Sequence, residues 1–334
     1  METLEDQLSR LAEERGFSGA IRVDRDGEVV LERAYGLAER GLEVANTVDT
    51  QFALASATKG LTALTLVSLV REGLLALDTT ARSVLGRDLP EIDDRVTIEH
   101  LLAHRSGIGD YLDEDAGFDV TDYLMPVPVQ ELASTEGYLR VLEGYPAKSL
   151  PGERFAYCNS GYVVLALVAE RVTGVPFHEL VRTWVCEPAG MADTAFLRSD
   201  ELPGKAARGY LGPDGLRTNV LHLPVRGSGD GGVYATVADV HRFWSALFEG
   251  RIVPDEWVQQ MLRPRSEVPE ESRRYGLGFW LHGSREAVIL EGYDAGVSFR
   301  TVHDPSARVT FTVVSNTSEG AWPLARYLED TLLG

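Results

Sequence analysis

The sequence predicts an α+β protein: an antiparallel β-sheet built from both ends of the chain and flanked by helices, with a mainly helical lobe inserted between those ends. Apolar and polar residues alternate in residues 21–31 and again in residues 275–315, as in half-buried strands, whereas apolar residues recur at helical spacing in between. We therefore expect residues 1–55 and 222–334 to form a sheet lobe and residues 56–221 to form a helical lobe, with a cleft between them.

The individual elements follow in order along the chain. The first segment, "METLEDQLSRLAEERG", spaces its leucines along one face of a helix. A hairpin is predicted next, because Ile21 and Val23 alternate with polar residues and Asp26-Gly27 supplies a turn. In the middle of the chain, "SGYVVLALVAERVTG" predicts a helix that ends at its last glycine. Near the C-terminus, "EAVILEG", "GVSFRTVHD" and "RVTFTVVSN" predict strands before a closing helix over residues 322–333.

Composition narrows the possible partners. The chain has 334 residues, 44% of them hydrophobic, which is enough for a substantial core. Its formal net charge of -19 disfavours nucleic acid and anionic membranes, because both are held by concentrated positive charge. A small molecule is therefore the expected partner.

Cysteine usage and the start of the chain bear on the compartment. Cys158 and Cys186 are too few for a disulfide framework or a four-thiolate metal site, so we expect both to be free thiols in a reducing compartment. The acidic start does not resemble a secretory leader, and no apolar run is long enough for a membrane span. We expect a cytoplasmic protein.

A lysine stands at the start of an apolar helix, although lysine is rare in this chain. Of 32 Lys and Arg residues, only Lys59, Lys148 and Lys205 are lysines. An arginine keeps its proton in proteins, whereas a buried lysine can lose it. Ser56 and Lys59 stand three residues apart at the N-terminal end of this helix, so their side chains share one face. A neutral amine beside a hydroxyl is a base beside a nucleophile. The alternative is that Ser56 caps the helix and Lys59 extends to solvent.

A tyrosine and an asparagine form a second candidate pair. Tyr157 and Asn159 lie two residues apart in "PGERFAYCNSGY", between a Pro-Gly turn and a helix, so both side chains can face the same way. A phenol can relay a proton, and an amide can orient a carbonyl group. The alternative is a buried tyrosine followed by an asparagine that caps the helix.

These two pairs together resemble a known family. Ser56-Ala57-Thr58-Lys59 followed by Tyr157-Cys158-Asn159 is similar to the serine β-lactamase and penicillin-binding superfamily, especially its class C and family VIII esterase branch. Three further segments resemble sequences of family members at the expected positions: "LLAHRSGI", "CEPAGMADTAF" and "GDGGVYATVADVHRF". The likeness therefore extends over about residues 17–316. It implies a β-lactamase/transpeptidase-like fold, with no cofactor and no metal.

The resemblance also implies roles for the residues. Ser56 would be the acylated nucleophile and its backbone N–H half of the oxyanion hole. Lys59 would accept the serine proton, Tyr157 would carry a proton to the leaving group, and Asn159 would orient the substrate. Whether Lys59 or Tyr157 takes the first proton stays open at this point.

The family's third element, Lys-Thr-Gly, His-x-Gly or Trp-x-Gly, departs from its usual form in "EGYDAGVSFR". Aligning the preceding glycine makes the triplet Tyr293-Asp294-Ala295 and gives Gly296 the second oxyanion N–H. Aligning the later glycine makes it Asp294-Ala295-Gly296 and gives that role to Val297. We favour the first alignment and place Tyr293, Asp294 and Gly296 among the substrate-binding residues.

Asp294 bears on the substrate. β-Lactams and cell-wall peptides carry a carboxylate, which an aspartate at this position would repel, so neutral substrates or substrates with a free amine are favoured. Two alternatives stay open: Asp294 closes a turn and faces solvent, or Arg300 restores a positive charge nearby.

Two further patterns are weaker. "GSGDGG" satisfies G-x-G-x-x-G, but no βαβ unit precedes it and Asp230 would repel a pyrophosphate. His100 and His104 have the spacing of metal ligands on a helix, but lack the glutamate and third ligand of such sites, so core or loop-anchoring histidines are favoured.

The leading hypothesis is a serine hydrolase that forms an acyl-enzyme with small esters or amides. The alternatives are a β-lactamase or D,D-peptidase, and a binding or sensor protein that kept the fold without turnover.

Overall fold

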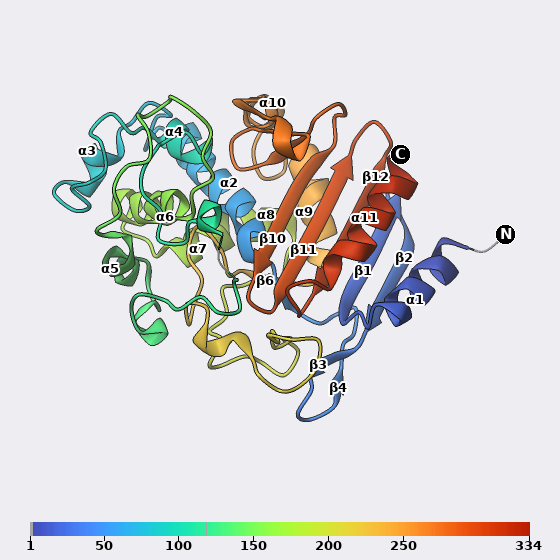
Figure 1. Cartoon of the computed structure of the whole chain (residues 1–334). Coiled ribbons are helices and arrows are strands. Elements are labelled where there is room, and N and C mark those ends of the chain that lie inside the picture. Colours follow the sequence, from blue (N-terminus) through green and yellow to red (C-terminus); the bar gives the residue numbers. More distant parts are fainter. Residues whose placement is uncertain (1–2, 118) are drawn as a thin grey trace.

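The computed structural model describes residues 3–117 and 119–334. Within these residues, one antiparallel sheet of eight strands runs in the order β2-β1-β12-β11-β10-β9-β8-β7 (Figure 1). Its strands are β1 (Gly19–Arg25), β2 (Glu28–Tyr35), β7 (Ser266–Val268), β8 (Arg273–Tyr275), β9 (Trp280–His282), β10 (Val288–Asp294), β11 (Val297–Asp304) and β12 (Val309–Ser315).

The two ends of the chain meet in this sheet, as predicted. β1 pairs with β12 in a register that sets Gly19 opposite Ser315, while the Asp26-Gly27 turn returns the chain into β2. Residue 26 has a φ of +55° and Gly27 a φ of +83°, and this left-handed backbone suits a tight hairpin. The hairpin and the C-terminal strands therefore form one continuous sheet.

Helices cover both faces of the sheet. On one face, α1 (Leu4–Glu14) and α11 (Ala321–Leu332) lie side by side (Figure 1). They bury Leu8, Leu324 and Leu328 in one cluster with Phe311 of β12. On the other face lie α9 (Val237–Phe248) and α2 (Thr58–Arg71). Along β10 the side chains alternate between the two hydrophobic clusters, which follows from the period of a strand.

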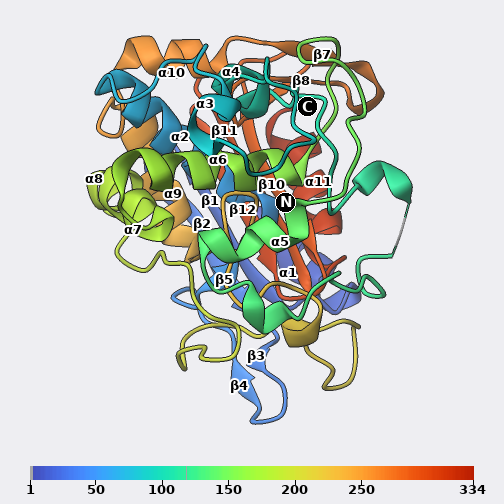
Figure 2. The ribbon, with the colours of Figure 1, turned by 90° about the vertical axis from the view of Figure 1, so that its left-hand side faces the viewer.

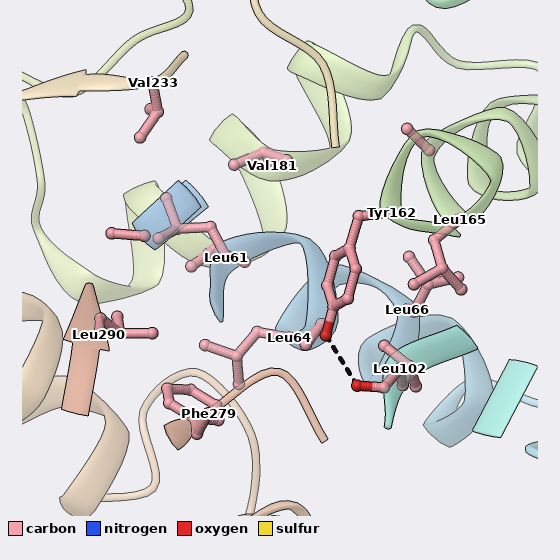
Figure 3. Close-up of a cluster of buried hydrophobic side chains, with 14 of the residues drawn as sticks. Leu61, Leu64, Leu66, Leu102, Tyr162, Leu165, Val181, Val233, Phe279 and Leu290 are labelled. Carbon is pink, nitrogen blue, oxygen red and sulfur yellow. Dashed lines mark hydrogen bonds between the residues drawn. The ribbon is translucent and has the colours of Figure 1, made fainter. Parts of the chain in front are cut away.

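The centre of the helical part is formed by α2 and α6 (Asn159–Thr173). Every α2 residue from Thr58 to Leu69 is buried, so this apolar helix is packed on all sides. Leu61 and Leu64 pack with Tyr162 of α6 and Phe279 (Figure 3). When the molecule is viewed from the side of the helical part, α6 crosses in front of the sheet (Figure 2).

Shorter elements complete the fold. The helices are α3 (Ala81–Leu85), α4 (Ile98–Leu102), α5 (Leu139–Leu142), α7 (Phe177–Val181), α8 (Glu187–Ala189) and α10 (Asp255–Leu262), and the strands are β3 (Leu37–Glu39), β4 (Val44–Ala45), β5 (Phe52–Ala53) and β6 (Tyr234–Ala235).

Cys158 and Cys186 are buried free thiols. Of the described helices, none alone is long and apolar enough to cross a membrane; the segments 159–173 and 177–189, bent by 88°, meet the length and composition criteria only together.

Candidate active site

Ser56 lies on a tight turn that leads into the buried helix. β5 pairs with β6 and is followed by the 3-10 turn η1 (Ala55–Ala57), which runs directly into α2. Ala55 has a left-handed φ of +46°, and such strain in a residue without a glycine's freedom is typical of functional turns. The turn leaves Ser56 partly exposed, one helical turn before the side chain of Lys59.

The amine of Lys59 is held by three oxygen atoms. Its Nζ lies 3.0 Å from Ser56 Oγ, 2.7 Å from Asn159 Oδ1 and 2.7 Å from the Asp230 carbonyl oxygen. The residue is only 2% exposed. Burial lowers the pKa of Lys59, while the carboxylates of Asp230 and Glu114 oppose that change. The prediction that this lysine is sheltered and next to the serine is therefore met by the geometry.

The hydrogen-bond partners favour a particular use of this amine. An amide oxygen and a carbonyl oxygen can only accept hydrogen bonds, so they bind two N–H groups of Lys59 in either protonation state. When the amine is neutral, these two bonds use both of its hydrogens and leave its lone pair for Ser56 Oγ. The arrangement can thus take a proton from the serine.

Asn159 is fixed on both sides of its amide. Its Nδ2 donates to the Leu112 carbonyl at 2.9 Å and to a carboxylate oxygen of Glu114 at 3.2 Å. Its backbone N–H donates to Asp110 at the start of α6. Since the nitrogen is bound to these acceptors, the amide oxygen is the atom that faces Lys59. In this structure Asn159 therefore orients Lys59, and its predicted contact with substrate stays a prediction.

Tyr157 completes the group on the helical side. The Lys59 Nζ lies 4.9 Å from the centre of the Tyr157 ring. Burial raises the pKa of Tyr157 well above its ordinary value, and a hydrogen bond with Ser56 works in the opposite direction. The phenol is therefore protonated at neutral pH and adjacent to the serine, so it has a proton to give.

β10 approaches the serine turn at Gly292. A Cβ on Gly292 would lie 2.1 Å from the Leu54 carbonyl oxygen and 3.0 Å from the Ala55 Cβ, so only glycine fits there. Neither predicted alignment makes this glycine the last residue of the third triplet. By this contact the triplet beside Ser56 is 290–292, with Leu290 buried at its first position.

The predicted role of Gly296 is wrong. Its backbone N–H donates to Ser318 Oγ at 2.9 Å, so it is not free for an oxyanion. The pairing of β10 with β11 makes the backbone N–H of Tyr293 the candidate for the oxyanion hole instead. Asp294 and Val297 close a two-residue turn, which makes Tyr293 and Ser298 the next, non-hydrogen-bonded pair. The Tyr293 N–H therefore points to the other edge of β10, which β9 pairs only at Val288 and Ile289.

The side chains at the end of β10 also alternate. Tyr293 bonds to Glu319 and is 41% exposed, at the rim of the cleft. Asp294 lies on the same side of the strand as Gly292 and faces the cleft, not solvent as in the alternative interpretation. Burial, with a further contribution from Asp230, raises the pKa of Asp294 to about 7. The alternative that Arg300 supplies a positive charge is wrong, because Arg300 pairs with Glu291 and Glu329 on the face covered by α11.

Ser56, Asn159, Tyr293 and Asp294 line one hollow of about 870 Å³, counted with the solvent open to it. Its polar wall holds Ser56, Asn159, Glu114, Asp230 and Asp294, and none of the described lining residues is a lysine or an arginine. Its lining also includes many apolar and aromatic residues, namely Leu112, Val120, Tyr123, Met125, Leu197, Leu223, Pro224 and Val225. The cleft is therefore lined by both carboxyl groups and apolar side chains.

Sequence reasoning missed several residues at this site. Asp230 was noted only as an obstacle to a dinucleotide, yet its carbonyl binds Lys59 and its carboxylate accepts a 2.5 Å hydrogen bond from Tyr111. The loop "GSGDGG" thus wraps the start of α2. No motif in the sequence indicated that Glu114 would lie at this site. Among the described residues, no group of three His, Cys, Asp or Glu side chains could hold a metal ion.

Comparisons with known proteins identify the family of this chain. The sequence profile of the family described as Beta-lactamase matches residues 4–331. Esterase EstB of Burkholderia gladioli is 32% identical over 314 residues, which cover 85% of this chain and 78% of the esterase. A D-aminopeptidase of Brucella anthropi is 27% identical over 331 residues, which cover 96% of this chain but only 60% of the aminopeptidase.

A solved structure gives the same result over almost the full length. The crystal structure of a penicillin-binding protein from Bacillus halodurans is similar with a TM-score of 0.91 at 33% identity, covering 97% of this chain and 99% of that one. The chain therefore belongs to the beta-lactamase family of serine hydrolases.

Proposed function

We propose that this protein hydrolyses small esters or amides through an acyl-enzyme on Ser56. The observation that carries the proposal is the position of Lys59 Nζ, 3.0 Å from Ser56 Oγ and bound to two oxygens that only accept hydrogen bonds. A buried amine whose lone pair is directed at a hydroxyl is a competent general base.

In the acylation step, Lys59 takes the hydroxyl proton while Ser56 Oγ attacks the substrate carbonyl carbon. The negative charge that develops on the carbonyl oxygen is stabilised by the backbone N–H groups of Ser56 and Tyr293. Tyr157 gives its phenolic proton to the leaving alcohol or amine and is reprotonated from Lys59. Water then attacks the acyl-enzyme, and the same groups act in the reverse direction to release the acid.

The charge of the cleft supports neutral or amine-bearing substrates. Three carboxylates, those of Glu114, Asp230 and Asp294, line it together with an apolar wall. A substrate carboxylate would face like charges without a cation to compensate for them. β-Lactamase or D,D-peptidase activity is therefore the less favoured alternative, and the name of the D-aminopeptidase relative agrees with an amine-bearing substrate.

The proposal is tested with three variants and p-nitrophenyl esters of acetate and butyrate. We expect Ser56→Ala to lose turnover and labelling by a fluorophosphonate. Lys59→Arg is expected to lower kcat/KM by at least about 10²-fold, because a guanidinium keeps its proton. Lys205→Arg is the matched control, since Lys205 pairs with Asp193 at the surface. Unchanged turnover in Ser56→Ala would overturn the proposal.

The alternatives have their own readouts in the same preparation. Incubation with a penicillin followed by intact-mass measurement reveals a β-lactam adduct, and we expect none. If a panel of esters and D-amino amides shows neither burst nor turnover while a ligand raises the melting temperature, the protein is a binder and not an enzyme.

A further inference from the structure

His104 contacts the segment that carries Tyr157 at three points. Its carbonyl oxygen accepts the Ala156 N–H at 2.8 Å, and its Nδ1 accepts the Cys158 N–H at 3.1 Å. Between these two bonds, its ring lies against the Tyr157 ring with centroids 4.3 Å apart. One residue thus fixes the backbone on both sides of the tyrosine as well as the tyrosine ring.

A cage of aromatic rings fixes His104 in turn. The histidine is 1% exposed and lies within 6 Å, between ring centroids, of Phe155, Tyr162 and Tyr275. Tyr162 donates to the Leu102 carbonyl of α4 at 2.8 Å (Figure 3), and Tyr275 belongs to β8 of the sheet. His104 therefore connects the tyrosine to both the helical part and the sheet.

The histidine carries two features that stability alone does not explain. Its backbone has a left-handed φ of +52°, which is unfavourable for a residue with a side chain. Because Nδ1 accepts a hydrogen bond, the proton of the neutral ring is on Nε2, and among the described residues no acceptor binds that N–H. A phenylalanine would fill the cage without a buried unpaired N–H. Compared with phenylalanine, histidine adds a hydrogen-bond acceptor, Nδ1, for the Cys158 N–H.

We propose that His104 is a positioning residue for the hydrolytic reaction, which holds the Tyr157 phenol at the distance from Ser56 that proton delivery to the leaving group requires. The inference rests on the proposed role of Tyr157. It agrees with a neutral His104, since burial and the nearby Lys59 lower the pKa of His104 well below its ordinary value.

The test separates the ring of His104 from its acceptor. His104→Phe keeps an aromatic ring but loses the acceptor, whereas His104→Asn keeps an acceptor at the place of Nδ1 and tolerates the left-handed backbone. His303→Phe is the matched control, because His303 also stacks on an aromatic ring, Trp244, and bonds to Thr310, but on strand β11. Fluorophosphonate titration gives the active fraction of each variant.

The readout is the dependence of kcat/KM on the leaving group for p-nitrophenyl, phenyl and ethyl esters of one acid. p-Nitrophenolate leaves without a proton, whereas ethoxide needs one. Per active site, we expect His104→Phe to lose less than about 3-fold on the p-nitrophenyl ester and at least about 10-fold on the ethyl ester. We expect His104→Asn to recover most of the ethyl-ester activity and His303→Phe to match the wild type.

Tyr157→Phe, measured on the same esters, separates the two hypotheses. Suppose that Tyr157→Phe loses activity mainly on the ethyl ester. The inference about His104 is then overturned if His104→Phe loses activity equally on all three esters, or if His104→Asn recovers none of the ethyl-ester activity. If Tyr157→Phe itself loses equally on all three esters, the proposed role of Tyr157 fails, and the inference about His104 fails with it.

Discussion

At the scale of single residues, the site combines one buried amine with several carboxyl groups that line the cleft. Asp230 and Glu114 lie close enough to Lys59 to oppose the effect of burial on its pKa. The same burial raises the pKa of Asp230, Glu114 and Asp294. The protonation of these groups is therefore coupled, and the charge that meets a substrate depends on pH.

Asp294 gives this coupling a measurable consequence. Its pKa is raised to about 7, so the carboxyl group is neutral below that pH and negative above it. We expect the ratio of kcat/KM for a trimethylammonium ester to that for its uncharged tert-butyl isostere to rise with pH through about 7. The charge of this substrate does not titrate, and the effect of pH on Lys59 as a general base is common to both esters.

The matched variants for this prediction are Asp294→Asn and Asp330→Asn. Asp294→Asn should lower the ratio about 10-fold at pH 8, because one favourable charge contact is lost, and should remove the part of its rise near pH 7 that is due to Asp294. Asp330 is an exposed residue of α11 and its variant should keep the wild-type ratio. A ratio that stays the same in Asp294→Asn would show that Asp294 does not contact the substrate cation.

At the scale of elements, the position of β10 against the serine turn decides the oxyanion geometry. The sequence was sufficient to predict this strand and the helix that carries Lys59, because the strand is a short apolar run bounded by a turn and the helix is a long apolar run. It was not sufficient to choose which glycine meets η1. Gly292 and Gly296 are both plausible from the strand pattern, and only the three-dimensional contact with Leu54 distinguishes them.

A variant at Gly292 tests this contact. A Cβ there meets backbone atoms, which cannot rotate away, so we expect Gly292→Ala to lower the free energy of unfolding by about 1–3 kcal/mol. It should also lower kcat/KM, because β10 has to move away from Ser56. Urea denaturation and steady-state kinetics measure the two effects.

The control for Gly292 is Gly204→Ala. A Cβ on Gly204 has no atom within 4 Å among the described residues, so this variant should match the wild type in both measurements. Equal behaviour of the two variants would show that β10 does not press on the serine turn.

At the scale of the whole molecule, the union of both chain ends in one sheet was predictable, since each end shows period-two alternation and the middle does not. The surroundings of Lys59 were not predictable in the same way. His104, Glu114 and Asp230 come from separate loops, and their meeting depends on how α2 and α6 pack. Hydrophobic periodicity specifies elements, but it carries no information about such loop-to-loop contacts.

The terminal helices lie on the face of the sheet away from the cleft, so their packing should affect stability without affecting chemistry. Leu8 of α1 is fully buried in the cluster with α11. We expect Leu8→Ala to lower the free energy of unfolding by about 2–5 kcal/mol, with kcat/KM per active site unchanged. Thermal or urea denaturation and titrated kinetics provide the measurements.

Leu42→Ala is the matched control, because Leu42 is 79% exposed and the same truncation should change the free energy of unfolding by less than about 0.5 kcal/mol. A loss of kcat/KM per active site in Leu8→Ala would mean that the terminal helices influence the cleft after all.

The pairing of β1 with β12 also bears on how the protein is made. β1 and β2 leave the ribosome long before β12, which is the neighbour that covers the open side of β1. Until then, that strand exposes unpaired backbone groups, which are a template for wrong partners. The first hairpin therefore stays without its neighbour on the open side of β1 until the distant strand β12 has been synthesised.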